Sequence, residues 1–316
     1  MAFMVGKVSL VAAPLLLDRG TWVRADGNSE SFTPDSVKTQ LSDSPLDYLE
    51  QLSLFQKLKR ECTYLDLSQK IGQLQSEFAK RVFEGKKEKF WSYVADDYIE
   101  KYVSEVERAI RVPLRENRPF LAIGGSHTIG WPVSKAIFNQ FNSMRDKISI
   151  IFFDEHEDDY AKDMQKIRPT MYHGSWAEVV RRNFGCTPFH IKPENFDSGK
   201  LEKELKGKKF LYLSVDVDVF DLEHAPSTFY ALRDPTFSVG TMDYDLWKRY
   251  LGEIKQIADE NYVKILGADL SEFIPYGHTQ GDNKITSEHS VKLLSDLHEL
   301  VSGHKARENT VHTLQI

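Results

Sequence analysis

Aspartate and histidine are concentrated in three short segments, each at the end of an apolar run. These segments are residues 124–127, 154–158 and 214–218. Side chains alternate between the two faces of an extended backbone, so Asp154, His156 and Asp158 are expected to point the same way. By the same argument Asp216 and Asp218 share one face of their own segment. The sequence therefore predicts that carboxylates and imidazoles meet at one place.

Such a cluster needs counter-charge, because carboxylates held close together repel one another strongly. The six candidate ligands are His127, Asp154, His156, Asp158, Asp216 and Asp218. Carboxylate and imidazole together are typical ligands of divalent Mn²⁺, Fe²⁺, Ni²⁺ or Zn²⁺. Two divalent ions bring four positive charges against the four carboxylates. We therefore predict a binuclear metal site.

At these residues the sequence resembles the ureohydrolase family, which includes arginase, agmatinase and formimidoylglutamase. The family signatures read Gly-Gly-Asp-His, Asp-Ala-His-x-Asp, Ser-x-Asp-x-Asp and a later Glu-x-x-Pro. The corresponding segments here end at His127, Asp158, Asp218 and Pro275, and they lie in the same order. The resemblance covers residues 118–300. It implies a metal-dependent hydrolase that cleaves a non-peptide C–N bond of a linear guanidino or amidine compound with a metal-bridging hydroxide.

The resemblance also implies how the ligands divide between the two ions. One ion would take His127, Asp154, Asp158 and Asp216, and the other would take Asp154, His156, Asp216 and Asp218. Asp154 and Asp216 would then bridge the pair. Mn²⁺ is the expected metal, with Ni²⁺, Fe²⁺ or Zn²⁺ as alternatives.

Two further residues match family positions that act on the substrate. Glu272 matches the carboxylate that grips the guanidinium through paired hydrogen bonds, the alternative being a surface or helix-capping glutamate. His173 matches a histidine that assists proton transfer to the leaving amine, the alternative being an ordinary loop histidine. Asp221 matches the last aspartate of the third signature, and we expect it to orient His156 or the strand ends.

Departures from the family pattern leave the substrate open. Ser126 replaces an acid beside the ligand His127, and Phe229 replaces a glycine near the third signature. Tyr160 and Pro169 lie in the stretch where arginase anchors the charged end of arginine, so we expect arginine to be a poor substrate. An agmatine-like substrate, a guanidino acid and a formimidoyl compound remain alternatives.

Two other classes of protein compete with a ureohydrolase. A metal-binding pseudoenzyme with a structural or regulatory role is suggested by Ser126, Glu155 and Phe229, although no candidate ligand is missing. A zinc deacetylase of related fold would use a single metal, whereas Asp158 and Asp218 supply ligands for a second ion.

The apolar runs indicate the elements that position these residues. Runs expected to form buried parallel strands are residues 8–13, 119–123, 148–153, 210–218 and 262–270. Helical patterns lie between them, which predicts a three-layer α/β/α domain with a mainly parallel central sheet. In such sheets functional residues lie at the carboxyl ends of the strands. Residues 8–13 follow Lys7 and could also be read as a signal peptide, but the strand is favoured.

We expect residues 1–316 to form one domain. Residues 44–112 are expected to be a helical block with an exposed turn at 85–87, residues 18–44 a surface loop, and residues 303–316 a loose tail. The net charge of −6 gives no electrostatic reason to expect nucleic acid or an anionic membrane as partner. Two distant cysteines favour a cytoplasmic location. The resemblance also allows a homo-oligomer.

Overall fold

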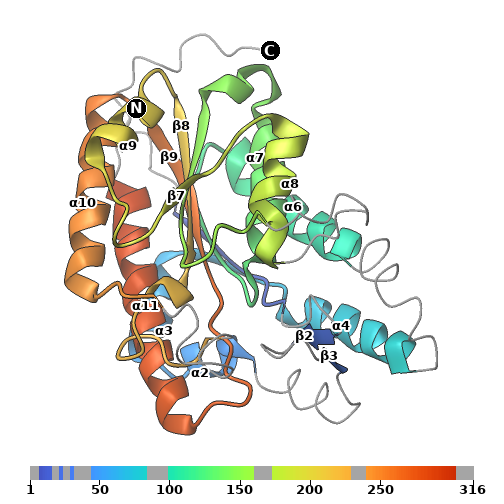
Figure 1. The fold of residues 1–316 in the computed structure, drawn as a ribbon. Coiled ribbons are helices and arrows are strands. Elements are labelled where there is room, and N and C mark those ends of the chain that lie inside the picture. The colour runs from blue at the N-terminus through green and yellow to red at the C-terminus, as the bar shows by residue number, and fades with distance from the viewer. Residues whose placement is uncertain are drawn as a thin grey trace.

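Seven parallel strands form the central sheet of the protein (Figure 1). The computed structural model describes residues 7–15, 21–23, 29–31, 44–83, 99–159, 173–228 and 240–303. The strands are β1 (Ser9–Ala12), β4 (Thr63–Asp66), β5 (Phe120–Ile123), β6 (Ile148–Phe153), β7 (Phe189–Ile191), β8 (Phe210–Asp216) and β9 (Lys264–Ser271). Their order in space is β4-β1-β5-β9-β8-β6-β7, and each neighbouring pair is parallel.

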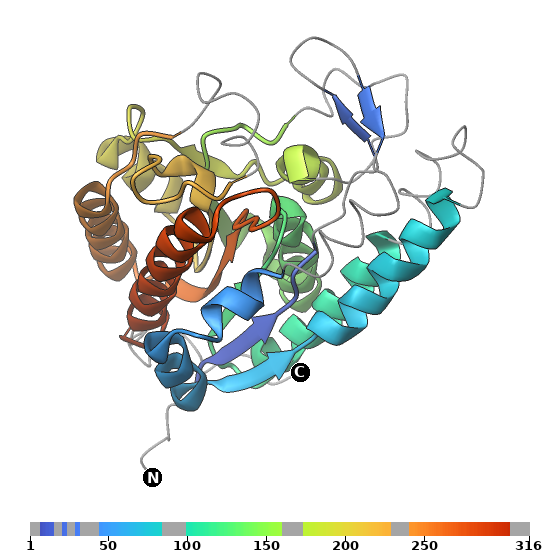
Figure 2. The same ribbon diagram turned by 90° about the horizontal axis from the view of Figure 1, so that it is seen from below.

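Helices cover both faces of this sheet, as Figures 1 and 2 show. One layer contains α2 (Pro45–Leu49), α3 (Ser53–Glu61), α9 (Ser198–Leu205), α10 (Tyr244–Glu260) and α11 (Gln280–Gly303). The other contains α4 (Ser68–Phe83), α6 (Ile99–Arg115), α7 (Gly130–Gln140) and α8 (Trp176–Phe184). Strand β1 contributes side chains to the hydrophobic cores on both faces of the sheet, because Leu10 packs into the first layer and Val11 into the second. The predicted three-layer α/β/α architecture is confirmed.

All five predicted central strands are present, and two of them have one end that differs by two residues from the expected bound. Strand β8 ends at Asp216 rather than 218, because the chain turns there into the 3₁₀ turn η7 (Val217–Val219). Strand β9 begins at Lys264 rather than 262, since Tyr262 has a left-handed φ of 57° and belongs to the turn before the strand. The strand reading of residues 8–13 is confirmed by the buried β1.

Two expectations for the amino-terminal half were wrong in part. The block 44–112 is not wholly helical, since it contains strand β4, which pairs with β1. Strand β4 lies at the edge of the sheet and is mostly exposed, so it lacks the apolar run that marks the central strands. The segment 18–44 contains the antiparallel pair β2 (Thr21–Val23) and β3 (Ser29–Ser31). The signal for this hairpin was Asp26-Gly27 between the two short strands.

The four motif-bearing strands are immediate neighbours in the order β5-β9-β8-β6. Because they are parallel, their carboxyl ends meet at one edge of the sheet. The expected turn at 85–87 and the tail 304–316 lie outside the described residues. Among the helices that are described, none is both long and apolar enough to span a bilayer.

Candidate metal centre

Three carboxylates surround one ring nitrogen of His127. The atom Nδ1 lies 2.8 Å from Asp154 Oδ2, 3.0 Å from Asp158 Oδ2 and 3.1 Å from Asp216 Oδ2. All four side chains are buried. One ring N–H points in a single direction, so it cannot satisfy three carboxylate oxygens at once. Asp158 Oδ2 accordingly accepts no hydrogen bond within the described part of the chain.

A second group lies beside the first and shares Asp154 with it. His156 Nδ1 is 3.0 Å from Asp218 Oδ2 and 3.4 Å from Asp154 Oδ1. Asp154 therefore offers Oδ2 to the first group and Oδ1 to the second, as a bridging carboxylate would. Asp216 lies with the first group, and its expected contact with a second ion stays a prediction.

The donor set of these residues fits divalent cations. His127, Asp154 and Asp216 offer ligand atoms that lie within 4.8 Å of one another, and so do Asp154, His156 and Asp218. Each set combines carboxylate oxygens with an imidazole nitrogen, as Mn²⁺, Fe²⁺, Ni²⁺ and Zn²⁺ prefer. The structure thus brings together all six predicted ligands.

Without cations this cluster must hold extra protons. Burial and the neighbouring carboxylate of Asp154 raise the pKa of Asp158 to about 7. Burial and the nearby Asp218 carboxylate raise the pKa of Asp216 well above its usual range. Despite burial, which opposes the charge, hydrogen bonds to carboxylates raise the pKa of His127 well above its usual value and that of His156 to about 12. Cations that replace these protons would relieve the repulsion.

The ligands converge for a different reason from the one expected. Strand β6 ends at Phe153, and residues 154–158 lie outside any strand with a bend at 155–156, so strand alternation does not place Asp158. Instead Asp154 Oδ1 accepts from the backbone N–H of His156 at 2.6 Å, and Asp158 adopts a left-handed φ of 48°. In the third segment, Asp216 Oδ1 accepts from the Asp218 N–H at 2.8 Å and opens the turn η7. Local turns of this kind aim the carboxylates at the cluster.

A chain of buried hydrogen bonds fixes the ring of His127. His127 Nε2 lies 2.9 Å from Ser214 Oγ, which donates to Asp269 Oδ1 at 3.0 Å. Tyr212 donates to the other oxygen of Asp269. Because the single Ser214 hydrogen is used on Asp269, the serine accepts from Nε2–H, which leaves Nδ1 as the ligand atom. On the other side, the His127 ring packs against Trp176 at 5.1 Å between ring centroids.

Sequence reasoning did not assign this role to Ser214, Asp269 or Tyr212. Ser214 and Asp269 are directly paired across β8 and β9. Both are fully buried in the middle of largely apolar strands. A polar residue inside a doubly covered strand requires a partner, and this was the available signal.

Glu272 follows β9 and lies against the backbone of the first ligand. Its Oε1 accepts from the N–H of His127 at 2.8 Å, and its own N–H donates to the carbonyl of Gly125 at 2.7 Å. It is 4% exposed and has a left-handed φ of 65°. A buried charge on a strained backbone is typical of a functional position. Its contact with a substrate stays a prediction.

The remaining expectations have mixed outcomes. Asp221 Oδ1 accepts from the N–H groups of Glu223 and His224 and lies 2.7 Å from His224 Nδ1, which are contacts within its own turn. Its expected role in orienting His156 or the strand ends stays a prediction. His173 begins the 3₁₀ turn η6 (His173–Ser175), but its side chain lies outside the described residues. Tyr160, Pro169 and Phe229 also lie outside them.

Comparison with known proteins gives the family of this chain. The model of the arginase family matches residues 31–196, more than half of the sequence. The chain belongs to the arginase family. The matched range contains His127, Asp154, His156 and Asp158, and the structure brings Asp216 and Asp218 of this arginase-family chain to the same place.

Curated relatives and solved structures agree with that assignment. Agmatinase of Bacillus subtilis (strain 168) is 28% identical over 209 residues, covering 58% of this chain and 63% of the relative. Arginase 2, chloroplastic/mitochondrial, of Arabidopsis thaliana is 25% identical over 214 residues, covering 60% and 56%. The matches of this arginase-family chain therefore span less than two thirds of the length of these relatives.

The fold itself is shared with solved members of the family. Arginase from Medicago truncatula superposes with a TM-score of 0.54 at 15% identity, covering 95% of this chain and 89% of the other. Formimidoylglutamase from Bacillus subtilis subsp. subtilis str. 168 gives a TM-score of 0.54 at 16% identity, covering 96% and 89%. At such identities the likeness shows the fold alone.

Proposed function

We propose that this chain is a binuclear-metal hydrolase that cleaves a non-peptide C–N bond of a linear guanidino or amidine compound. The observation that carries the proposal is the pair of buried histidine–carboxylate groups joined by Asp154, whose two oxygens face different groups. His127, Asp158 and Asp216 would hold one ion, and His156 and Asp218 the other. Two bound divalent ions supply Lewis acidity and make water a nucleophile at neutral pH.

Glu272 supplies the substrate contact in this proposal. Its carboxylate is buried next to the His127 backbone, and its charge is close enough to raise the pKa of Asp216. A planar guanidinium or amidinium matches a carboxylate with paired, charge-assisted hydrogen bonds. Such a contact would orient the electrophilic carbon toward the metal ligands. In the same proposal, His173 passes a proton to the leaving amine.

The preferred substrate class is agmatine-like compounds or guanidino acids. A curated relative at 28% identity is named agmatinase, and the polar anchors expected for arginine are replaced at Tyr160 and Pro169. A formimidoyl substrate is the second candidate, because the small residue Ser126 before His127 resembles the pattern of formimidoylglutamase. Rejection of arginine by more than about a thousandfold follows if its charged ends stay unpaired.

A product-release screen tests this proposal. The Mn²⁺-loaded protein is incubated with arginine, agmatine, guanidinobutyrate, guanidine and formimidoylglutamate, and urea, ammonia and formamide are measured separately. Urea from agmatine or guanidinobutyrate is the expected result, and formamide would select the second candidate. Efficient hydrolysis of arginine would contradict the substrate assignment, whereas two bound ions without any turnover would favour a pseudoenzyme.

Asp216→Asn provides the matched loss-of-function variant. The change keeps the side-chain shape and removes the charge of a ligand 3.1 Å from His127 Nδ1. Asp245→Asn removes an exposed carboxylate from the first turn of α10 and serves as its control. Activity should fall at least about a hundredfold in the first variant only.

A further inference from the structure

The peptide between Asp154 and Glu155 lies between the edge strand β7 and the second metal group. Its carbonyl oxygen, on Asp154, lies 2.8 Å from Nε2 of His190 in β7. Its N–H, on Glu155, donates to Asp218 Oδ1 at 3.3 Å. One rigid peptide plane therefore connects His190 to a candidate ligand that is 28 positions further along the chain.

The chemistry of the carbonyl fixes how His190 must behave. A carbonyl oxygen only accepts hydrogen bonds, so the hydrogen of this contact is on Nε2 of His190. The ring is also held flat against Phe152, with centroids 4.5 Å apart and an interplanar angle of 12°. Stacking and the hydrogen bond together leave the imidazole little freedom to turn.

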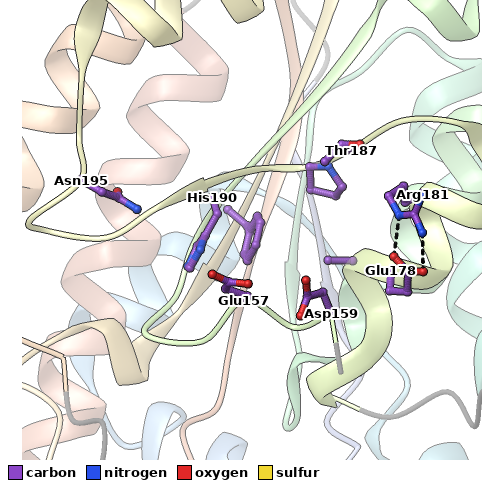
Figure 3. Close-up of a pocket in the computed structure, with 10 residues that line it drawn as sticks. Glu157, Asp159, Glu178, Arg181, Thr187, His190 and Asn195 are labelled. Atoms are coloured by element: carbon purple, nitrogen blue, oxygen red, sulfur yellow. Dashed lines mark hydrogen bonds and ion pairs between the residues drawn. The ribbon is translucent and has the colours of Figure 1, made fainter. Parts of the chain in front are cut away.

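Figure 3 shows the cavity that His190 lines. The volume of this cavity is about 330 Å³, and its wall also contains Glu157 from the ligand segment and Asp159 directly after it. None of the six candidate metal ligands lines this cavity. His190 is thus reached from the surface, while its Nε2 points to the backbone of the metal centre.

Two further contacts tie the same turn to β7. Asp154 N–H donates to the carbonyl of Ile191 at 3.4 Å. Lys192 Nζ lies 3.1 Å from Glu155 Oε1, and both side chains are partly exposed. The Ile191 contact continues the strand pairing and the Lys192 pair is a surface ion pair of small energetic value. Of these three contacts, the His190 hydrogen bond is the one that holds the carbonyl of the 154–155 peptide.

We propose that His190 is a positioning residue for the second metal ion. By holding the Asp154 carbonyl it keeps the Glu155 N–H directed at Asp218, and it fixes the backbone from which the shared Asp154 carboxylate projects. Loss of the hydrogen bond lets the peptide turn, which removes a donor from Asp218 and loosens its orientation. The inference rests on the proposed two-ion function.

The matched variants are His190→Gln and His190→Met. The two side chains have the same length and similar volume, but only glutamine offers an N–H near the position of Nε2. Mn²⁺ is titrated into the chelator-treated full chain, and the two binding steps are fitted separately. We expect one of the two steps, that of the second metal group, to lose about tenfold to a hundredfold in affinity in His190→Met, while the other step changes less than about threefold. His190→Gln should restore the affected step to within about threefold of wild type.

A structural role alone would give a different result. Thermal unfolding of the metal-free variants separates a positioning role from a purely structural one. A general loss of packing would lower the unfolding temperature of both variants and weaken both binding steps. Lys192→Met, which breaks only the surface ion pair, should bind both ions as wild type does. Wild-type affinities in His190→Met, or equal losses in the Gln and Met variants, would overturn the role of His190. Fewer than two ions in the wild type would instead overturn the proposed function.

Discussion

At the scale of single residues, the centre contains two carboxylates on unusual backbone. Asp158 and Glu272 have left-handed φ values of 48° and 65°. This conformation costs a residue other than glycine roughly 1–2 kcal/mol. The cost is offset where the conformation places a needed group, and both side chains lie beside His127. Backbone strain at these two positions therefore supports a role for both in the centre.

Glu272→Gln tests the proposed substrate contact. The amide keeps an oxygen that accepts the N–H of His127, so the backbone there should stay in place. It loses the charge and one acceptor, which weakens a charge-assisted contact worth about 2–3 kcal/mol. Steady-state kinetics should show turnover reduced by roughly a hundredfold, with Mn²⁺ content unchanged. Normal turnover would remove Glu272 from the substrate site.

At the scale of elements, the strands were easier to predict than the turns that follow them. Near-continuous apolar runs identified the five central strands, because both faces of each are covered. The ligand turns depend on side chains that bond to nearby N–H groups, as Asp154 does to His156 and Asp216 to Asp218. The spacing of two residues between each of these aspartates and the next ligand was the sequence signal for such turns. The edge strand β7 and its His190 offered no comparable apolar pattern.

Gly240→Ala tests how closely the turn η7 is packed. A Cβ at Gly240 would lie 1.9 Å from the carbonyl oxygen of Val219, next to Asp218. The backbone must shift to relieve this clash, so both stability and affinity at the second metal group should fall. Gly252→Ala is the control, because a Cβ there meets no atom within 4 Å.

In helix α10, Gly252→Ala should stabilise the protein by roughly 0.5–1 kcal/mol, since alanine is the better helix former. Urea unfolding measures both variants, and Mn²⁺ titration follows the metal site. Equal metal affinity in Gly240→Ala and wild type would show that η7 tolerates movement.

Helix α11 makes acid stability depend on a buried histidine. His289 packs against the rings of Phe220, His224 and Tyr244, and its Nε2 has no hydrogen-bond partner in the described residues. Burial and the neighbouring His224 and Lys292 lower its pKa to about 3. The unfolded chain binds this proton near pH 6.5, so stability is full above that pH and falls as the pH drops toward 3.

His289→Phe removes this titration and keeps an aromatic ring in place. Urea unfolding of metal-free protein should show about 2 kcal/mol less pH dependence between pH 7 and pH 5 in the variant than in wild type. Metal-free protein is required because the metal ligands also titrate. If the two proteins lose stability in parallel, His289 does not titrate in this range.

At the scale of the whole molecule, the spatial order of the strands explains what the sequence could and could not reveal. The motif strands lie in the order β5-β9-β8-β6, which differs from their order in the chain. The carboxyl ends of adjacent parallel strands meet at one edge of the sheet whatever the order of the strands. The six ligands were therefore predictable from their spacing and residue types. The pairing of Ser214 with Asp269 depends on β8 lying beside β9 in one register, which spacing does not determine.

In the proposed function, one buried cluster holds two divalent ions. Calorimetric titration of the metal-free protein with Mn²⁺ at pH 7.5, in two buffers of different ionisation enthalpy, tests it most directly. Because hydrogen bonds to carboxylates raise the pKa values of His127 and His156, we expect both rings to be protonated before metal binds. We predict two ions per chain and release of about two protons or more. One ion or none, or binding without proton release, would contradict the account.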